Sequence, residues 1–114
     1  MRINGTDIAL TRGDTAIFSL EIRDIDDELI QFEKGDKVYF TVKTSTETTN
    51  IIFQKIINIA YTQEEIVIDI EPDDTKDLRY KDYVYDIQYN RANGEVHTVV
   101  PVSKFTVAHE VTYD

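Results

Sequence analysis

The chain is 114 residues long, which is enough for one domain with its own core. Its formal net charge of −10 excludes the basic stripe that a nucleic-acid binder needs and disfavours contact with anionic membranes. The absence of cysteine excludes disulfides, thiol nucleophiles and cysteine–zinc sites. A hydrophobic content of 41% indicates a folded core instead of a disordered chain.

The N-terminal residues, Met1 to Asp7, contain no apolar run like that of a secretory signal peptide. No stretch of the chain approaches the length of a membrane span. We therefore expect a protein that is made in the cytoplasm and carries no visible export signal.

Short runs that alternate between apolar and polar residues recur along the chain, with turn-forming residues between them. Such alternation puts one set of side chains on each face of a β-strand. In the segment 37–43, for example, Val38, Phe40 and Val42 share one face. The pattern predicts extended segments over 3–10, 15–23, 37–43, 51–59, 66–71, 83–89, 95–102 and 103–108. The first is interrupted by Asn4-Gly5, and the last continues the segment before it.

Three of these segments leave alternatives open. The segment 51–59 is apolar almost throughout, so a short helix competes with a strand, although its β-branched residues favour a strand. In 95–102 we expect Val96, Thr98 and Val100 on one face and His97 and Val99 on the other, with an edge or a bulge at Pro101. The tail 109–114 either extends the last strand or hangs free.

The clearest strand lies in the stretch 78–89, where Tyr83, Tyr85, Ile87 and Tyr89 fall on one face. Pro72 and the acidic residues after it predict a single helical turn over 73–78, with Leu78 pointing inward. A hairpin loop over 90–94 follows the strand. A leucine-ended turn before a tyrosine-rich strand resembles the tyrosine corner of immunoglobulin-like domains, a part that either Tyr83 or Tyr85 would play.

Short strands at intervals of about ten residues, without long amphipathic helices, are typical of an antiparallel sandwich. We therefore predict that residues 1–114 form a single domain. Its fold is expected to be an immunoglobulin-like antiparallel β-sandwich of about seven to eight strands, with one short helical turn near 73–78.

Residues with catalytic potential are few. His97 and His109 are the two histidines, and neither lies in a recognised nucleophile motif, so we interpret them as ordinary strand residues. The chain has no tryptophan for sugar stacking and no glycine-rich phosphate loop. We therefore predict a protein that is not an enzyme, with no catalytic residues and no cofactor, and rank a small hydrolase last.

Two polar turns have a functional alternative. The acidic cluster Asp24, Asp26, Asp27 and Glu28 contains oxygen ligands suited to Ca²⁺, but it lacks the spacing of the helix–loop–helix calcium motif. We interpret it as a solvated turn and predict no metal site, while a Ca²⁺ or glycan site at Asp24, Asp26 and Asp27 stays open. Arg12-Gly13-Asp14 matches an integrin-binding tripeptide, but we interpret it as a plain turn between strands.

Three segments together carry a family resemblance. They are Leu10-Thr11-Arg12-Gly13-Asp14-Thr15-Ala16-Ile17-Phe18, then Gly35 to Lys43, and then Pro72-Asp73-Asp74-Thr75 through Tyr83-Val84-Tyr85-Asp86-Ile87. With these segments the chain resembles the immunoglobulin-like N-terminal domain of phage baseplate upper proteins. That family has a Gly-Asp-Thr turn before its first long strand and a tyrosine-rich strand near its end.

The resemblance implies a structural component of a phage or phage-derived particle, at the tail, baseplate or head surface. Its partners would be other particle proteins, it would be multimeric in the particle, and it would neither bind nucleic acid nor insert into a membrane. Baseplate upper proteins carry further domains, whereas this chain ends at Asp114, which favours a stand-alone structural piece. The alternative is an extracellular carbohydrate- or cell-surface-binding module, with Tyr39, Tyr61 and Tyr80 as stacking faces.

Overall fold

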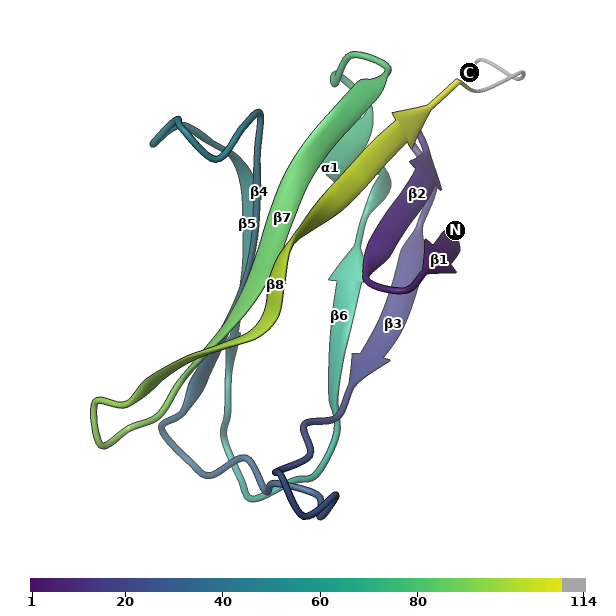
Figure 1. Cartoon of the computed structure of the whole chain (residues 1–114). Helices are drawn as coiled ribbons and strands as arrows, with labels where there is room; N and C mark the ends of the chain where they lie inside the picture. The colour runs from purple at the N-terminus through teal and green to yellow at the C-terminus, as the bar shows by residue number, and fades with distance from the viewer. Residues whose placement is uncertain (110–114) are drawn as a thin grey trace.

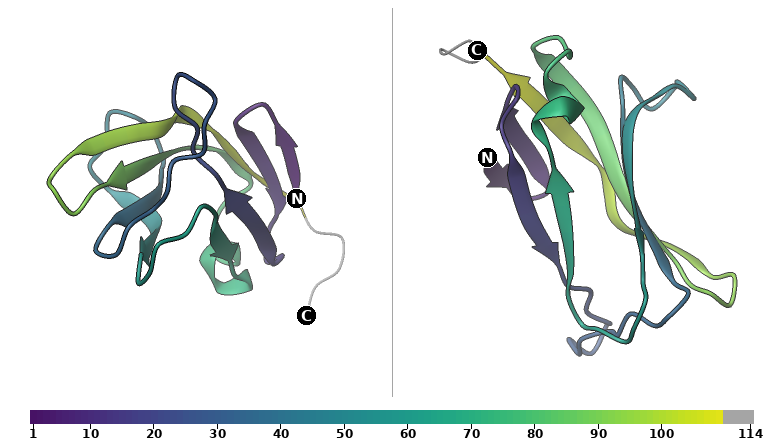
Figure 2. Two further views of the ribbon diagram at one scale, coloured as in Figure 1. Left: turned by 90° about the horizontal axis from the view of Figure 1, so that it is seen from below. Right: turned by 180° about the vertical axis from the view of Figure 1, so that it is seen from behind.

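The computed structural model describes residues 1–109, apart from the side chains of residues 2–4. It is an all-β sandwich of two facing sheets with one short helix, as Figures 1 and 2 show. The predicted fold class is thereby confirmed. The two alternatives for the tail concern residues that, from 110 onward, lie outside the described part of the chain.

The larger sheet has six strands in the order β1-β2-β8-β7-β4-β5. The alternation of apolar and polar residues is what lets these strands bury one face and leave the other open to solvent. Their bounds are β1 Arg2–Asn4, β2 Asp7–Thr11, β4 Lys37–Lys43, β5 Ile51–Asn58, β7 Lys81–Asn90 and β8 Val96–Ala108.

The smaller sheet has two antiparallel strands, β3 (Ala16–Leu20) and β6 (Ile66–Ile70). The helix α1 (Pro72–Thr75) follows β6 directly, and Leu78 packs partly buried against the core, as predicted. Two strands therefore cover one face of a six-stranded sheet. The small sheet is therefore too narrow to cover the whole inner face of the large sheet.

The predicted interruption of the segment 3–10 is confirmed, since it forms two strands joined by a turn at Gly5, whose φ of 63° suits glycine. Another predicted strand limit was wrong. The strand predicted over 15–23 ends at Leu20, because its partner β6 begins at Ile66, the residue opposite Leu20. Two other predictions are confirmed. The segment 103–108 continues 95–102 in one strand, β8, and 51–59 is a strand, the favoured of its two alternatives.

The sheet is also not purely antiparallel. Strand β2 pairs in parallel with the second half of β8, from Phe105 to Ala108. A pattern of alternating residues carries no information on strand direction, so the sequence did not reveal this pairing.

Strand β8 changes register twice against β7. Ile87 lies opposite Val100, while Gln88 lies opposite Thr98 and Tyr85 opposite Ser103. These shifts are bulges, one of which contains Pro101, as predicted. They overturn one face assignment, because Val100 lies on the inner side with His97 and not with Val96 and Thr98.

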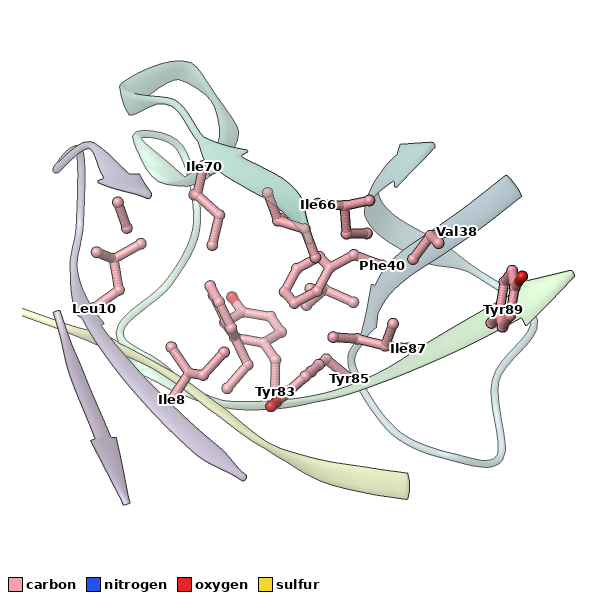
Figure 3. Close-up of a cluster of buried hydrophobic side chains, with 14 of the residues drawn as sticks. Ile8, Leu10, Val38, Phe40, Ile66, Ile70, Tyr83, Tyr85, Ile87 and Tyr89 are labelled. Atoms are coloured by element: carbon pink, nitrogen blue, oxygen red, sulfur yellow. The ribbon is translucent and has the colours of Figure 1, made fainter. Parts of the chain in front are cut away.

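The core lies between the two sheets, and Figure 3 shows the inward side chains of both layers. Phe40 is at its centre, with its ring centroid 5.1 Å from that of Tyr85, 5.9 Å from Phe18 and 6.2 Å from Phe105. All four predicted inward residues of β7 are buried, namely Tyr83, Tyr85, Ile87 and Tyr89.

Tyrosine hydroxyls tie the start of β7 to other parts of the chain. The Tyr83 hydroxyl donates to the Arg79 carbonyl oxygen at 3.1 Å, four residues upstream. This contact resembles a tyrosine corner, and Tyr83, not Tyr85, makes it. The Tyr85 hydroxyl instead donates to the carbonyl oxygen of Thr6, in the turn between β1 and β2.

The helix α1 links both layers. The buried Thr75 hydroxyl oxygen accepts from the Gly13 N–H at 2.9 Å, which fixes the turn between β2 and β3. On the other side, Lys55 Nζ of β5 lies 2.7 Å from Asp74 Oδ2. The edge strand of the large sheet is thus held to the end of the small one.

Candidate binding surfaces

The small sheet exposes an unpaired edge on β3. Among the described residues, β3 pairs with β6 alone, and its register has no bulge. Its five residues, Ala16–Leu20, include no charged residue and no proline. Edge strands normally carry such features as protection against pairing with other chains. The edge of β3 is therefore suited to accept a further strand.

The outer face of the same small sheet carries exposed apolar side chains. Ile17 on β3 is 62% exposed and Val67 on β6 is 50% exposed. Ile17 lies opposite Asp69, and Ser19 lies opposite Val67, so the two apolar residues are diagonal neighbours. Together they form an apolar spot beside the open edge of β3.

A cavity of about 480 Å³ lies just beyond the end of β3. Its apolar lining is Leu20, Ile22, Ile30 and Val99, each only partly buried. Its polar lining includes Glu95 and His97 of the β7–β8 hairpin, whose side chains are 3.1 Å apart at Glu95 Oε2 and His97 Nε2. The contact with His97 lowers the pKa of Glu95.

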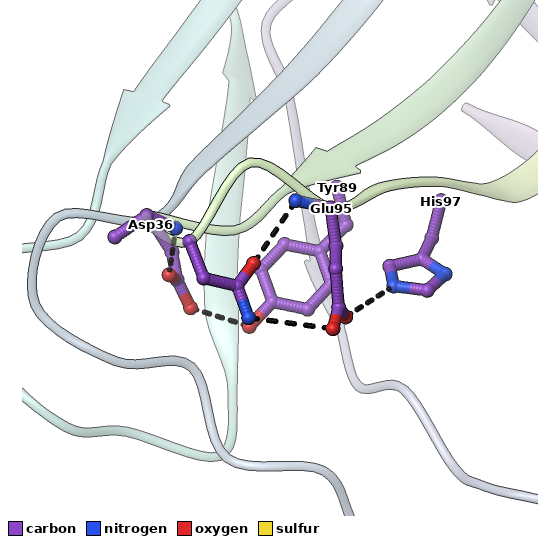
Figure 4. Close-up of polar contacts among 6 residues, drawn as sticks. Asp36, Tyr89, Glu95 and His97 are labelled. Atoms are coloured by element: carbon purple, nitrogen blue, oxygen red, sulfur yellow. Dashed lines mark hydrogen bonds and ion pairs between the residues drawn. The ribbon is translucent and has the colours of Figure 1, made fainter.

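Tyr89, which also lines this cavity, belongs to a buried polar cluster around Asp36, and Figure 4 shows the contacts of Asp36 and Tyr89. The Asp36 carboxylate accepts from the Tyr89 hydroxyl and from the N–H groups of Glu33 at 2.9 Å and Ala92 at 2.8 Å. Burial acts to raise the pKa of Asp36, but these hydrogen bonds and the charge of Arg91 outweigh it, so the pKa lies below its ordinary value. The cluster stabilises the loops and leaves the carboxylate fully occupied.

The outer face of the large sheet holds a second hollow, with a volume of about 460 Å³. We call it the outer depression. Tyr39, Thr41 and Lys43 of β4 line it, beside Asp86, Gln88 and Asn90 of β7. Gln54 of β5 also lines it and donates from Nε2 to the Thr41 hydroxyl at 2.9 Å. Gln88 and Thr41 alternate with buried core residues, so the strand pattern itself turns them outward.

The two histidines lie at opposite ends of β8. His97 belongs to the β7–β8 hairpin and contacts Glu95, whereas His109 follows β8 and stacks on Tyr80 with ring centroids 3.6 Å apart. Within the described part of the chain, no hydroxyl nucleophile is hydrogen-bonded to either histidine. The arrangement does not bring them together.

The acidic cluster forms a turn that the Asp24 side chain ties together. Asp24 Oδ1 accepts from the N–H groups of Asp26 at 2.9 Å and Glu28 at 3.0 Å, and Asp27 pairs with Arg23. In residues 1–109 the structure contains no group of three or more histidine, aspartate or glutamate residues placed to hold a metal ion.

The Arg12-Gly13-Asp14 segment is a turn, as predicted, and it packs against other elements. The Arg12 guanidinium carbon lies 4.2 Å from the centre of the Tyr80 ring. The Gly13 N–H is bonded to Thr75, as described above. Two of the three residues thus have structural contacts, so the turn does not present the tripeptide as a free loop.

The three tyrosines singled out as stacking faces are scattered. Tyr39 lines the outer depression, Tyr61 is 68% exposed in the link after β5, and Tyr80 is stacked between Arg12 and His109. The polar partners of Tyr39 were missed as a site. Their signal was present in the outward residues of 83–89, Asp86 and Gln88, but sequence alone does not show that β4 and β5 lie beside them.

In comparisons with known proteins, no family model, no curated protein and no solved structure matches this chain. In the part of the chain that the structure describes, no helix has the length and apolarity that crossing a bilayer requires.

Proposed function

We propose that this protein is a non-enzymatic structural subunit that binds other proteins by accepting an extended strand at the open edge of β3. The observation that carries the proposal is the unprotected edge of a two-stranded sheet that faces a six-stranded one. An added strand would satisfy the free N–H and C=O groups of β3 through main-chain hydrogen bonds.

The surroundings of β3 favour such a partner. Side chains of an added strand would alternate between the apolar spot at Ile17 and Val67 on the outer face and the core side. Toward the end of β3, the partly buried Leu20, Ile22 and Ile30 line a cavity that the partner's side chains would fill. Burial of this apolar surface adds to the affinity that the main-chain bonds provide.

The setting we propose is a phage or phage-derived particle, at its tail, baseplate or head surface. The support is the resemblance of segments 10–18, 35–43 and 72–87 to the N-terminal domain of baseplate upper proteins, together with the sandwich fold. In a particle with many copies, a modest contact at each β3 edge suffices, because repeated contacts strengthen one another.

The test is co-sedimentation with particles. Lysate of the organism that encodes the chain is fractionated on a density gradient, and particle fractions are examined by electron microscopy and probed for the protein. We expect the protein in fractions that contain tail-like or phage particles. Ile17→Lys should reduce the bound share about tenfold, because a charge on the outer face deters strand pairing.

Val96→Lys is the matched control, since Val96 is 59% exposed and lies at the start of β8 in the other sheet. It should leave co-sedimentation unchanged. A protein that stays at the top of the gradient would refute the particle setting. Equal binding by wild type and a folded Ile17→Lys variant would refute the β3 edge as the contact.

A further inference from the structure

The outer depression has the size of a small-ligand site and a mixed lining. Its volume of about 460 Å³ lies within the range of about 300–1,000 Å³ typical of ligand pockets. It is built on the backbones of β4, β5 and β7, where β4 pairs with β7 on one side and with β5 on the other, in a register that shifts only between Val42 and Lys43 against β5. A site on paired strands holds its side chains more rigidly than a loop does.

The chemistry of the lining is rich in groups that both donate and accept. The amides of Gln54, Gln88 and Asn90 each offer an N–H₂ donor and an oxygen acceptor, as a hydroxyl-rich ligand requires. The Tyr39 ring lies on the same face, directly opposite Gln88 in the pairing of β4 with β7. A sugar ring combines these needs, since its C–H face packs on an aromatic ring and its hydroxyls reach the amides.

The charges in the outer depression balance. Lys43 and Asp86 are the charged residues of its lining, although the whole chain carries −10. A strongly charged ligand would leave one of these side chains facing a like charge. The lining therefore favours a ligand without net charge.

One atom at this site lacks a partner. Asn90 Oδ1 is buried and has no hydrogen bond within the protein. Buried polar atoms are nearly always hydrogen-bonded, and Asn90 lines the hollow, so a ligand hydroxyl would complete the hydrogen bonding of Oδ1 once the amide turns toward the hollow.

We infer that the outer depression binds a neutral carbohydrate, with Tyr39 as the stacking platform and Gln88, Gln54 and Asn90 as the hydrogen-bonding groups. This activity is separate from protein binding at β3, because the depression lies on the outer face of the large sheet and the open edge lies on the small one. A particle subunit with this site would contact glycans as well as its protein neighbours.

The experiment is a titration of the isotope-labelled chain with cellotetraose, maltotetraose and chitotetraose, followed by nuclear magnetic resonance. We expect at least one of them to cause saturable shifts at the amides of Thr41, Asp86 and Gln88. Tyr39→Ala and Gln88→Ala should each weaken binding at least about tenfold. Tyr61→Ala, which removes an exposed tyrosine elsewhere, should leave the affinity unchanged.

Three outcomes would overturn the inference. They are no saturable shift with any of the three oligosaccharides, equal affinity in folded Tyr39→Ala and Gln88→Ala variants, and tighter binding of anionic tetragalacturonate. Ile17→Lys should bind the sugar as wild type does, and Tyr39→Ala should co-sediment as wild type does. Failure of the sugar site and failure of the β3 contact are therefore distinguishable.

Discussion

At the scale of single residues, three buried tyrosines of β7 hold the fold together by different contacts. Tyr83 closes a local corner onto Arg79, Tyr85 reaches the β1–β2 turn at Thr6, and Tyr89 reaches Asp36. Each ring adds apolar area to the core while its hydroxyl finds a polar partner. The strand thus supplies packing and long-range ties with the same side chains.

Loss of the Tyr89 hydroxyl tests the cluster at Asp36. Tyr89→Phe should lower the free energy of unfolding by about 1–3 kcal/mol, because the buried carboxylate loses a donor. The pKa of Asp36 should rise, since the Tyr89 hydrogen bond is one of the contacts that lower it. Urea unfolding measures the first effect and a titration followed by nuclear magnetic resonance the second.

Tyr61→Phe is the control for this change, because Tyr61 is largely exposed. Its free energy of unfolding should match that of wild type. A Tyr89→Phe variant as stable as wild type would contradict a stabilising role for the contact with Asp36.

Alkaline pH should destabilise the fold through Tyr85 and Tyr89. Burial is the main reason that the pKa of each hydroxyl rises to about 12. The charge of Asp7 further raises the pKa of Tyr85, and the hydrogen bond with Asp36 further raises the pKa of Tyr89. In the unfolded chain the pKa of tyrosine is about 10. Because the folded values are higher, this contribution is complete below about pH 10 and is lost as the pH rises toward 12.

Urea unfolding at a series of pH values, with phenolate absorbance recorded in parallel, measures this loss. Replacement of both Tyr85 and Tyr89 by phenylalanine should make the decline between about pH 10 and 12 shallower. Constant stability of the wild-type protein across that interval would show that the two hydroxyls are not held in their protonated form.

At the scale of the elements, the pair Lys55–Asp74 joins the outermost strand of the large sheet to α1. Lys55 is an inward-pointing charge on an edge strand, a feature that also discourages pairing with other chains. Both side chains are mostly buried, with exposures of 26% and 19%. The contact therefore contributes more to the stability of the fold than an ion pair in open solvent does.

A double-mutant cycle measures the strength of this link. Lys55→Met and Asp74→Asn should each destabilise the protein, and the double variant should lose less than the sum of the two. The coupling should be about 1 kcal/mol, since the pair is screened only in part. The exposed pair Lys104–Asp82, 3.7 Å apart, is the control, with an expected coupling near zero. Additive effects at Lys55 and Asp74 would mean that the two elements are not coupled through this contact.

At the scale of the whole molecule, one aromatic cluster centred on Phe40 joins the two unequal layers of the sandwich. Phe40 is fully buried and contacts rings from both sheets, Phe18 on β3 and Phe105 on β8 among them. Its loss should affect the stability of the entire fold.

Phe40→Ala should lower the free energy of unfolding by about 3–5 kcal/mol, a large part of the roughly 5–15 kcal/mol typical of a domain. Phe53→Ala is the comparison, because Phe53 packs on the same ring at 6.1 Å but is only partly buried. Phe53→Ala should lower the free energy of unfolding by a clearly smaller amount. Chemical denaturation followed by tyrosine fluorescence gives both values, and equal losses would contradict the central place of Phe40.

The residue pattern predicted the strands well where alternation is strict. Val38, Phe40 and Val42 of β4, the isoleucines of β6 and the inward set of β7 are all buried as expected. Prediction failed at the first half of β8, because a bulge at Val99 changes the face of the residues beyond it and, unlike Pro101, Val99 gives no local sign of one. For the outer depression, the sequence predicted which residues of β7 point outward. It did not predict that residues of β4 and β5 lie beside them.

The sequence by itself determined which faces of most strands are apolar, where turns fall and that the core is aromatic. These properties depend on residues near one another in the chain. Only the tertiary structure decided that β2 runs parallel to β8, that two strands face six, and that Tyr39, Gln54 and Gln88 line one hollow. Strand order and pairing depend on contacts between distant segments, which a local pattern does not encode.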